Sequence, residues 1–225
     1  MFPISDSIKS KHFPFLTLFF IAVNVYVFFK ELVAPNTEGF IYAFSLIPSR
    51  VDLRDYTTLF PFVSAMFLHG GFLHIISNMW FLMIFGDNVE SFFGKFRYVF
   101  VYLVSGIAGN VLQYLLYPNS AIPMLGASGA VSGVLGAYYV LYPHSRIKTL
   151  LPIFFFITIV EIPAVIYLFY WFFIQLLSGV ASLPIATQTG GVAFWAHVGG
   201  FVAGIFFARM FQKERGKGYI EGEIV

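Results

Sequence analysis

Residues 126–142 read GASGAVSGVLGAYYVLY, an apolar stretch whose small residues predict how the helices of this chain pack. Small residues recur in it at four-residue spacing, once as Gly129 and Gly133 and again as Ser128 and Ser132. Small residues at this spacing let membrane helices pack with their backbones in close approach. The stretch therefore predicts a membrane helix that packs tightly against a neighbour and carries Ser128 in its first turn.

A second stretch, Trp195-Ala-His-Val-Gly-Gly200, opens another apolar run and repeats the spacing through Ala196, Gly200 and Gly204. His197 lies in its first turn. A polar or ionisable side chain inside a membrane is a functional-site hypothesis when it has a plausible partner. A neighbouring imidazole can take the proton of a serine hydroxyl and make it a competent nucleophile. We therefore predict that Ser128 is a nucleophile and His197 its general base, and that the reaction is peptide-bond hydrolysis within the membrane. Because no aspartate lies near either residue in the sequence, a dyad is expected rather than a triad.

The composition independently indicates a membrane protein. Of the 225 residues, 59% are hydrophobic and 11% are charged, whereas a soluble domain has about 25% charged residues. The chain has no cysteine, which excludes disulfides and cysteine nucleophiles. A net charge of +2 is too small to indicate nucleic-acid binding, and none is expected.

Six segments are long enough or apolar enough to be membrane helices, since a span needs roughly 20 apolar residues. They lie at about residues 13–33, 71–93, 97–117, 127–143, 157–178 and 193–211. The predicted fold class is an all-α membrane protein, a six-helix bundle forming a single domain over residues 1–225. The run 149–178 is too long for one span, and we expect its two prolines to divide it into an interfacial piece and a true span. The outer connection 34–70 is rich in apolar residues and is expected to lie partly in the membrane.

The basic residues predict the orientation of these spans. Ten of the 13 Lys and Arg residues lie before span one, between spans two and three, between spans four and five, or after span six. The positive-inside rule then places both termini in the cytoplasm and predicts a multi-pass protein of the plasma or inner membrane. Spans two, four and six all begin on the outer side, so His74, Ser128 and His197 are expected at one depth. Asn78 follows His74 by four residues and shares its helical face. We predict that His74, Asn78 and the Ser128 backbone N–H donate hydrogen bonds to a tetrahedral oxyanion.

Together these motifs resemble those of the rhomboid intramembrane serine proteases. The resemblance is carried by Phe67-Leu-His-Gly-Gly-Phe-Leu-His-Ile-Ile-Ser-Asn78, Phe85-Gly-Asp-Asn-Val-Glu90, Gly126-Ala-Ser-Gly129 and Ala196-His-Val-Gly-Gly200. It implies a rhomboid-like six-helix core with the serine at Ser128, the histidine at His197 and an oxyanion site near His74 and Asn78. It also implies Gly200-x-x-x-Gly204 as the packing motif of the sixth span.

Two departures from the family pattern concern the base and the outer loop. Family members often carry an aromatic residue one turn after the serine, where it packs on the histidine, and here that residue is Ser132. Either the base is held less firmly here, or another aromatic residue such as Trp195 takes the place of the missing one. The Trp-Arg pair often found in the first outer loop is missing.

The expected substrates are single-span transmembrane proteins in the lipid bilayer, and no cofactor or metal is expected. A non-catalytic rhomboid-like protein that binds or escorts membrane clients is the main alternative, although such relatives typically lack the serine and the histidine. A channel or transporter would need a polar stripe through the inner half of the membrane, and none is visible. A metalloprotease is excluded because the sequence lacks His-Glu-x-x-His, and an aspartyl protease is excluded because it lacks a pair of intramembrane aspartates.

Overall fold

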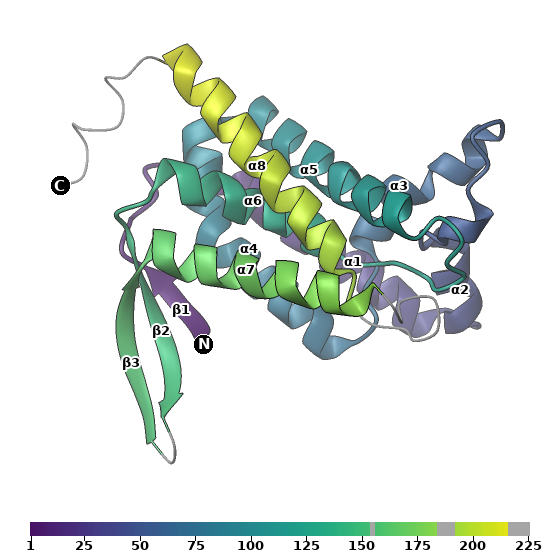
Figure 1. Ribbon diagram of the computed structural model, residues 1–225, viewed down its shortest axis with the longest axis horizontal. Coiled ribbons are helices and arrows are strands. Elements are labelled where there is room, and N and C mark those ends of the chain that lie inside the picture. Colours follow the sequence, from purple (N-terminus) through teal and green to yellow (C-terminus); the bar gives the residue numbers. More distant parts are fainter. Residues whose placement is uncertain (154–155, 184–191, 216–225) are drawn as a thin grey trace.

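The computed structural model describes residues 1–153, 156–183 and 192–215 (Figure 1). In chain order, the elements are β1 (Phe2–Asp6), α1 (Phe15–Val33), α2 (Thr37–Phe44), η1 (Pro48–Arg50), η2 (Tyr56–Leu59), α3 (Pro61–Ser64), η3 (Ala65–Phe67), α4 (Phe72–Phe93), α5 (Lys95–Leu116), α6 (Ser128–Leu141), β2 (Arg146–Ile153), β3 (Phe156–Pro163), α7 (Ala164–Ser182) and α8 (Phe194–Arg215).

The predicted all-α membrane class is confirmed. Within the described residues, α1, α4, α5, α7 and α8 are each long and apolar enough to cross a membrane. The helix α6 has 14 residues and is shorter than these, as its sequence predicted. Every residue from Gly129 to Tyr138 is buried, because the small residues of α6 let the neighbouring helices approach its backbone closely. The helices run side by side, with α6 behind α8 in Figure 1.

The prediction of a helix over 157–178 is wrong at its start, because residues 157–163 belong to strand β3 and α7 begins at Ala164. The sequence Ile157-Thr-Ile-Val-Glu-Ile162 is rich in β-branched residues, which favour strands. Pro163 follows and lacks a backbone N–H, so it ends the strand pairing and precedes the first turn of the helix. One proline therefore separates two kinds of structure, as expected, but the first is a strand.

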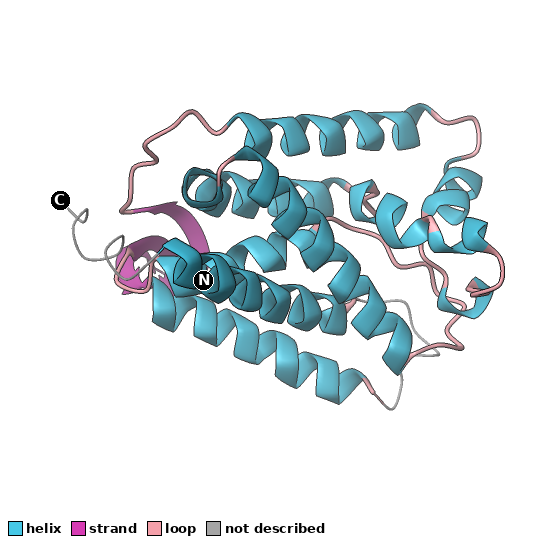
Figure 2. Cartoon of the chain, turned by 90° about the horizontal axis from the view of Figure 1, so that it is seen from above, coloured by secondary structure: helices cyan, strands magenta, loops and turns pink. Residues whose placement is uncertain are grey.

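The three strands form an antiparallel sheet in the order β1-β2-β3, which the sequence did not predict. The sheet lies at the end of the bundle where α7 begins and α8 ends (Figures 1 and 2). Strand β1 is fixed to α4, because the Trp80 indole donates to the Pro3 carbonyl at 2.7 Å and Asn88 Nδ2 donates to Asp6 Oδ2 at 2.9 Å. Asp6 also accepts a hydrogen bond of 2.5 Å from the Tyr138 hydroxyl of α6. Burial raises the pKa of the Asp6 carboxyl to about 6, against the lowering effect of these hydrogen bonds.

The connection between α1 and α4 supports the segment that leads into α6. Leu46 and Met124 exchange backbone hydrogen bonds of 3.0 and 2.8 Å. The Gly126 N–H donates to the Ala65 carbonyl at 2.9 Å. These bonds fix the chain just before Ser128. That this connection lies partly in the membrane stays a prediction.

Candidate active site

Ser128 is the first residue of α6, and a tight turn at Gly126 sets its position. Gly126 has φ of +129°, a conformation that favours glycine. A Cβ atom there would lie 2.7 Å from Nε2 of His74 and 3.5 Å from Oγ of Ser128. The His74 ring and the Ser128 hydroxyl therefore both lie next to Gly126, whose lack of a side chain leaves room for them.

His197 lies in the first turn of α8 and is buried. Helix α8 packs directly on the backbone of α6 through its glycines. A Cβ on Gly200 would lie 2.9 Å from the Gly129 carbonyl carbon, and one on Gly204 would lie 2.7 Å from that of Gly133. Both distances are below the 3.4 Å at which ordinary contact begins. Glycine at these two positions is what allows His197 to approach the start of α6.

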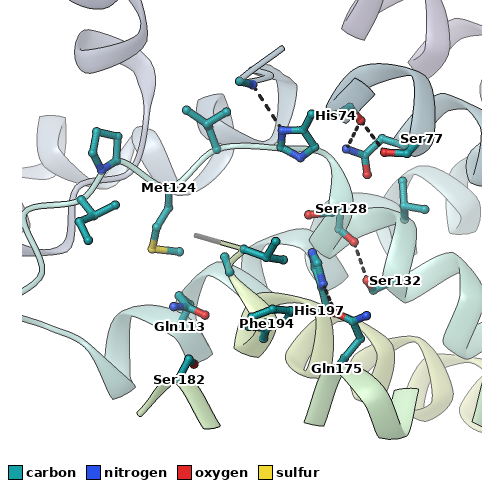
Figure 3. A pocket seen from close by; sticks show the side chains of 18 of the residues that line it. His74, Ser77, Gln113, Met124, Ser128, Ser132, Gln175, Ser182, Phe194 and His197 are labelled. Carbon is teal, nitrogen blue, oxygen red and sulfur yellow. Dashed lines mark hydrogen bonds between the residues drawn. The ribbon is translucent and has the colours of Figure 1, made fainter. Parts of the chain in front are cut away.

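The predicted site residues line one cavity of about 1150 Å³. Its walls come from α4, α6, α7 and α8, and its lining includes Ser128, His197, His74 and Asn78. Figure 3 shows the Ser128 side chain between His74 and His197. In the described part of the chain, the Ser128 hydroxyl makes no hydrogen bond to His197. Catalytic hydrogen bonds are often long or unformed without substrate.

The oxyanion candidates are oriented by local hydrogen bonds. His74 Nδ1 accepts from the Gly70 N–H at 3.3 Å, so the proton of a neutral imidazole lies on Nε2, which faces the turn before Ser128. Asn78 Nδ2 donates one hydrogen to the His74 carbonyl at 3.0 Å. An amide nitrogen has two hydrogens, so the second is left for a bound group. Both side chains are therefore able to donate into the cavity.

Sequence reasoning missed the residues that hold the imidazole, which come from α7. Gln175 Oε1 lies 2.7 Å from His197 Nδ1. Since a carbonyl oxygen only accepts, Nδ1 donates, and Nε2 keeps its lone pair. Four residues earlier on the same face, Trp171 packs on the imidazole with ring centroids 6.0 Å apart. Gln175 is the one amide side chain in the apolar run 164–177, and that was an available signal.

Neither Trp195 nor Ser132 packs on the His197 ring in the way that the family's aromatic residue does. The Trp195 ring does not take the place of the missing aromatic residue. It packs against Gly179, where a Cβ would lie 3.1 Å from Trp195 Cε2. Ser132 donates its hydroxyl to the Ser128 carbonyl at 2.6 Å. This bond uses the hydroxyl hydrogen of Ser132 within its own helix.

The chain matches known proteins over most of its length. The family model described as the Rhomboid domain matches residues 56–214. Rhomboid protein 1, mitochondrial, of Saccharomyces cerevisiae is 30% identical over 162 residues, which cover 68% of this chain and 42% of the yeast protein. Rhomboid protease GluP of Bacillus subtilis is 31% identical over 127 residues, or 55% of this chain and 24% of the bacterial protein. RHOMBOID-like protein 6, mitochondrial, of Arabidopsis thaliana is 41% identical over 75 residues, or 33% of this chain and 24% of the plant protein.

The matched segments thus cover between 24% and 42% of the length of these relatives. The Rhomboid domain alone extends over more than half of the present chain and contains the turn before α6, the glycine contacts of α8 and the cavity between them. The chain belongs to the rhomboid family.

Proposed function

We propose that this protein is an intramembrane serine endopeptidase that cleaves the transmembrane segments of single-span membrane proteins. The observation that carries the proposal is that Ser128 and His197 line the same cavity, each in the first turn of its helix. Non-catalytic binding of membrane clients would need a cavity but no nucleophile and no oriented base. The geometry therefore favours the enzyme.

In the proposed reaction, Ser128 Oγ attacks the carbonyl carbon of the scissile peptide bond while His197 Nε2 takes the hydroxyl proton. The tetrahedral intermediate carries its negative charge on the former carbonyl oxygen. His74 Nε2–H, the free hydrogen of Asn78 and the Ser128 N–H at the start of α6 are the donors for it. His197 then gives its proton to the leaving amine, and a water molecule hydrolyses the acyl-enzyme by the same route.

Gln175 supports this assignment, because the reaction needs His197 in one tautomer. By accepting from Nδ1–H, the amide oxygen leaves Nε2 unprotonated and directed away from α7. The amide is neutral and stabilises a developing imidazolium less than a carboxylate would. We therefore assign Gln175 as a positioning residue rather than a third member of a charged triad.

The same proposal includes the location of the protein. The apolar helices establish a membrane protein. The distribution of Lys and Arg supports a multi-pass protein of the cell membrane with both termini in the cytoplasm. In that orientation the cavity opens in the outer half of the membrane.

The test is covalent labelling of the purified protein with a fluorescent fluorophosphonate, which reacts with activated serines. Wild type is expected to be labelled and Ser128→Ala to remain unlabelled. Ser132→Ala is the matched control, because it removes a hydroxyl from the same helix but keeps the nucleophile. Absence of labelling in a wild-type protein that also leaves a membrane-protein substrate intact would favour the client-binding alternative.

A further inference from the structure

We propose that the hairpin formed by β2 and β3 binds the surface of the bilayer and inserts the exposed apolar side chains of β3, Phe156 and Ile159, among the lipid headgroups. The occupant of this surface is phospholipid on the side of the membrane where α7 begins. This inference does not depend on the proposed proteolytic activity.

The sequence of the hairpin changes character along its length. Near its base, Arg146, Lys148 and Glu161 are exposed, and Lys148 pairs across the strands with Glu161. Beyond this pair, residues 150–160 read LLPIFFFITIV, in which Thr158 is the one polar side chain. The hairpin therefore has a charged base and an apolar distal half.

The base is held by the helix bundle, but the distal half is not. Ile147 and Thr149 are completely buried against the rest of the protein. In contrast, Phe156 is 77% exposed and Ile159 is 62% exposed. Figure 1 shows the hairpin extending away from the helices, across the long axes of α7 and α8. Large apolar side chains gathered on an exposed surface indicate an interaction site.

The position of the hairpin identifies lipid as the partner. Since α7 and α8 cross the membrane, an element that extends crosswise from the end of α7 lies along the membrane surface beside the bundle. The apolar surface also continues from β3 into α7, where Ile166 and Phe169 are more than half exposed. The basic residues at the base suit anionic headgroups, which attract Lys and Arg close to the membrane surface.

Among the described residues, β3 pairs with β2 alone and its other edge is unpaired, which limits how deep the hairpin can lie. A strand at the edge of a sheet has backbone N–H and C=O groups without partners. Such groups are not tolerated in contact with the hydrocarbon core. The headgroup region provides water and polar groups for the backbone and still receives the apolar side chains. We therefore place Phe156 and Ile159 at the boundary between headgroups and acyl chains.

The absence of cysteine from the chain permits a direct test with single-cysteine variants. Phe156→Cys and Ile159→Cys place a fluorophore in the apolar half, and Glu161→Cys is the matched control at the base, two residues along the same strand as Ile159. Each labelled protein is reconstituted into vesicles of phosphatidylcholine and phosphatidylglycerol. Quenching is measured with aqueous iodide and with lipids that carry a nitroxide either near the headgroup or near the end of the acyl chain.

The proposal predicts that the labels at 156 and 159 are quenched several-fold less by iodide than the label at 161. It also predicts stronger quenching of these two labels by the shallow nitroxide than by the deep one. Iodide quenching equal to that at 161 would place positions 156 and 159 in water and overturn the proposal. Protection from both iodide and the nitroxides would also overturn it, because these positions would then lie against protein, such as a second copy paired along β3.

Discussion

The close contact between α6 and α8 leaves no room for a side chain at Gly200 or Gly204, so we expect substitutions at these positions to separate the two helices. In Gly200→Ala, the new methyl group would lie 2.9 Å from the Gly129 carbonyl carbon, where ordinary contact begins at 3.4 Å. The helices must then separate by at least 0.5 Å, the difference between these two distances. For Gly204→Ala the corresponding distance is 2.7 Å, and the separation is at least 0.7 Å. Gly129 follows Ser128 directly, so the separation displaces the hydroxyl from the imidazole.

A displacement of about 1 Å between reacting groups can lower a rate by about 100-fold. We expect Gly200→Ala to lower kcat by about 10-fold or more, and the larger side chain of Gly200→Leu to abolish turnover. Overpacking of this kind also lowers the free energy of unfolding by about 1–3 kcal/mol. The decrease in kcat is expected to accompany a lower unfolding temperature.

The assay is cleavage of a transmembrane substrate in vesicles, combined with thermal unfolding of the same samples. Val202→Ala is the matched control, because Val202 lies on α8 between the two glycines and is 51% exposed. It should change neither quantity appreciably. A wild-type kcat in Gly200→Ala would contradict this prediction, since it would show that α8 can move away from α6 without disturbing Ser128 and His197.

Four further predictions concern single side chains. Ser128→Ala and His197→Ala should each abolish cleavage. The double variant should be no less active than either single variant, because the two residues act as one proton-transfer unit. Substantial cleavage by either purified single variant would contradict the dyad. Asn78→Ala should lower kcat by up to about 100–1000-fold with little change in KM, as for loss of one oxyanion donor; a raised KM at constant kcat would instead assign it to substrate binding. Gln175→Leu should lower kcat by roughly 5–150-fold, from about 1–3 kcal/mol for a lost buried hydrogen bond, whereas Gln175→Asn should retain more activity; an unchanged kcat would remove its positioning role. The folded-state pKa of Asp6, about 6, lies above the ordinary 3.8, so the folded protein holds this proton more tightly and its stability decreases as pH rises from about 4 through 6. Asp6→Asn should flatten this part of the stability profile by up to about 2 kcal/mol after solvent screening. An unchanged pH profile in thermal unfolding would contradict this prediction.

The sequence predicted the helices well because their apolar pattern is dictated by the membrane. The boundaries of α4 and α6 differ from the predicted ones by a few residues, and the glycine spacing indicated which surfaces of α6 and α8 are suited to close packing. Both patterns are local in the sequence, so a single sequence is enough to recognise them.

The sheet and the α7 side of the cavity were not predicted, and the reasons differ. Strand β1 is defined only by pairing with β2 over 140 residues further along the chain, and its own five residues carry no strong signal. Length and hydrophobicity predict a helix within the run 149–178, but these two properties do not distinguish a strand from a helix. Gln175 could be noticed in the sequence, but its partner depends on which face α7 turns toward α8. That orientation is a tertiary property.

The two proposed catalytic side chains, Ser128 and His197, and the proposed positioning residue Gln175 belong to helices that differ in how deeply they are buried. Ser128 begins a helix that is buried over nearly its whole length, and its position is fixed by backbone contact with α8. Gln175 and Trp171 belong to α7, in which only Ala164, Tyr167, Leu168 and Gly179 are buried among the described residues. A helix with so few buried residues moves at a lower free-energy cost than one in the centre of the bundle. A movement of α7 away from α8 would leave Ser128 in place but remove the acceptor from His197 Nδ1. Under the proposed function, a displacement of α7 therefore lowers the activity of this protein more than it lowers the stability of its core.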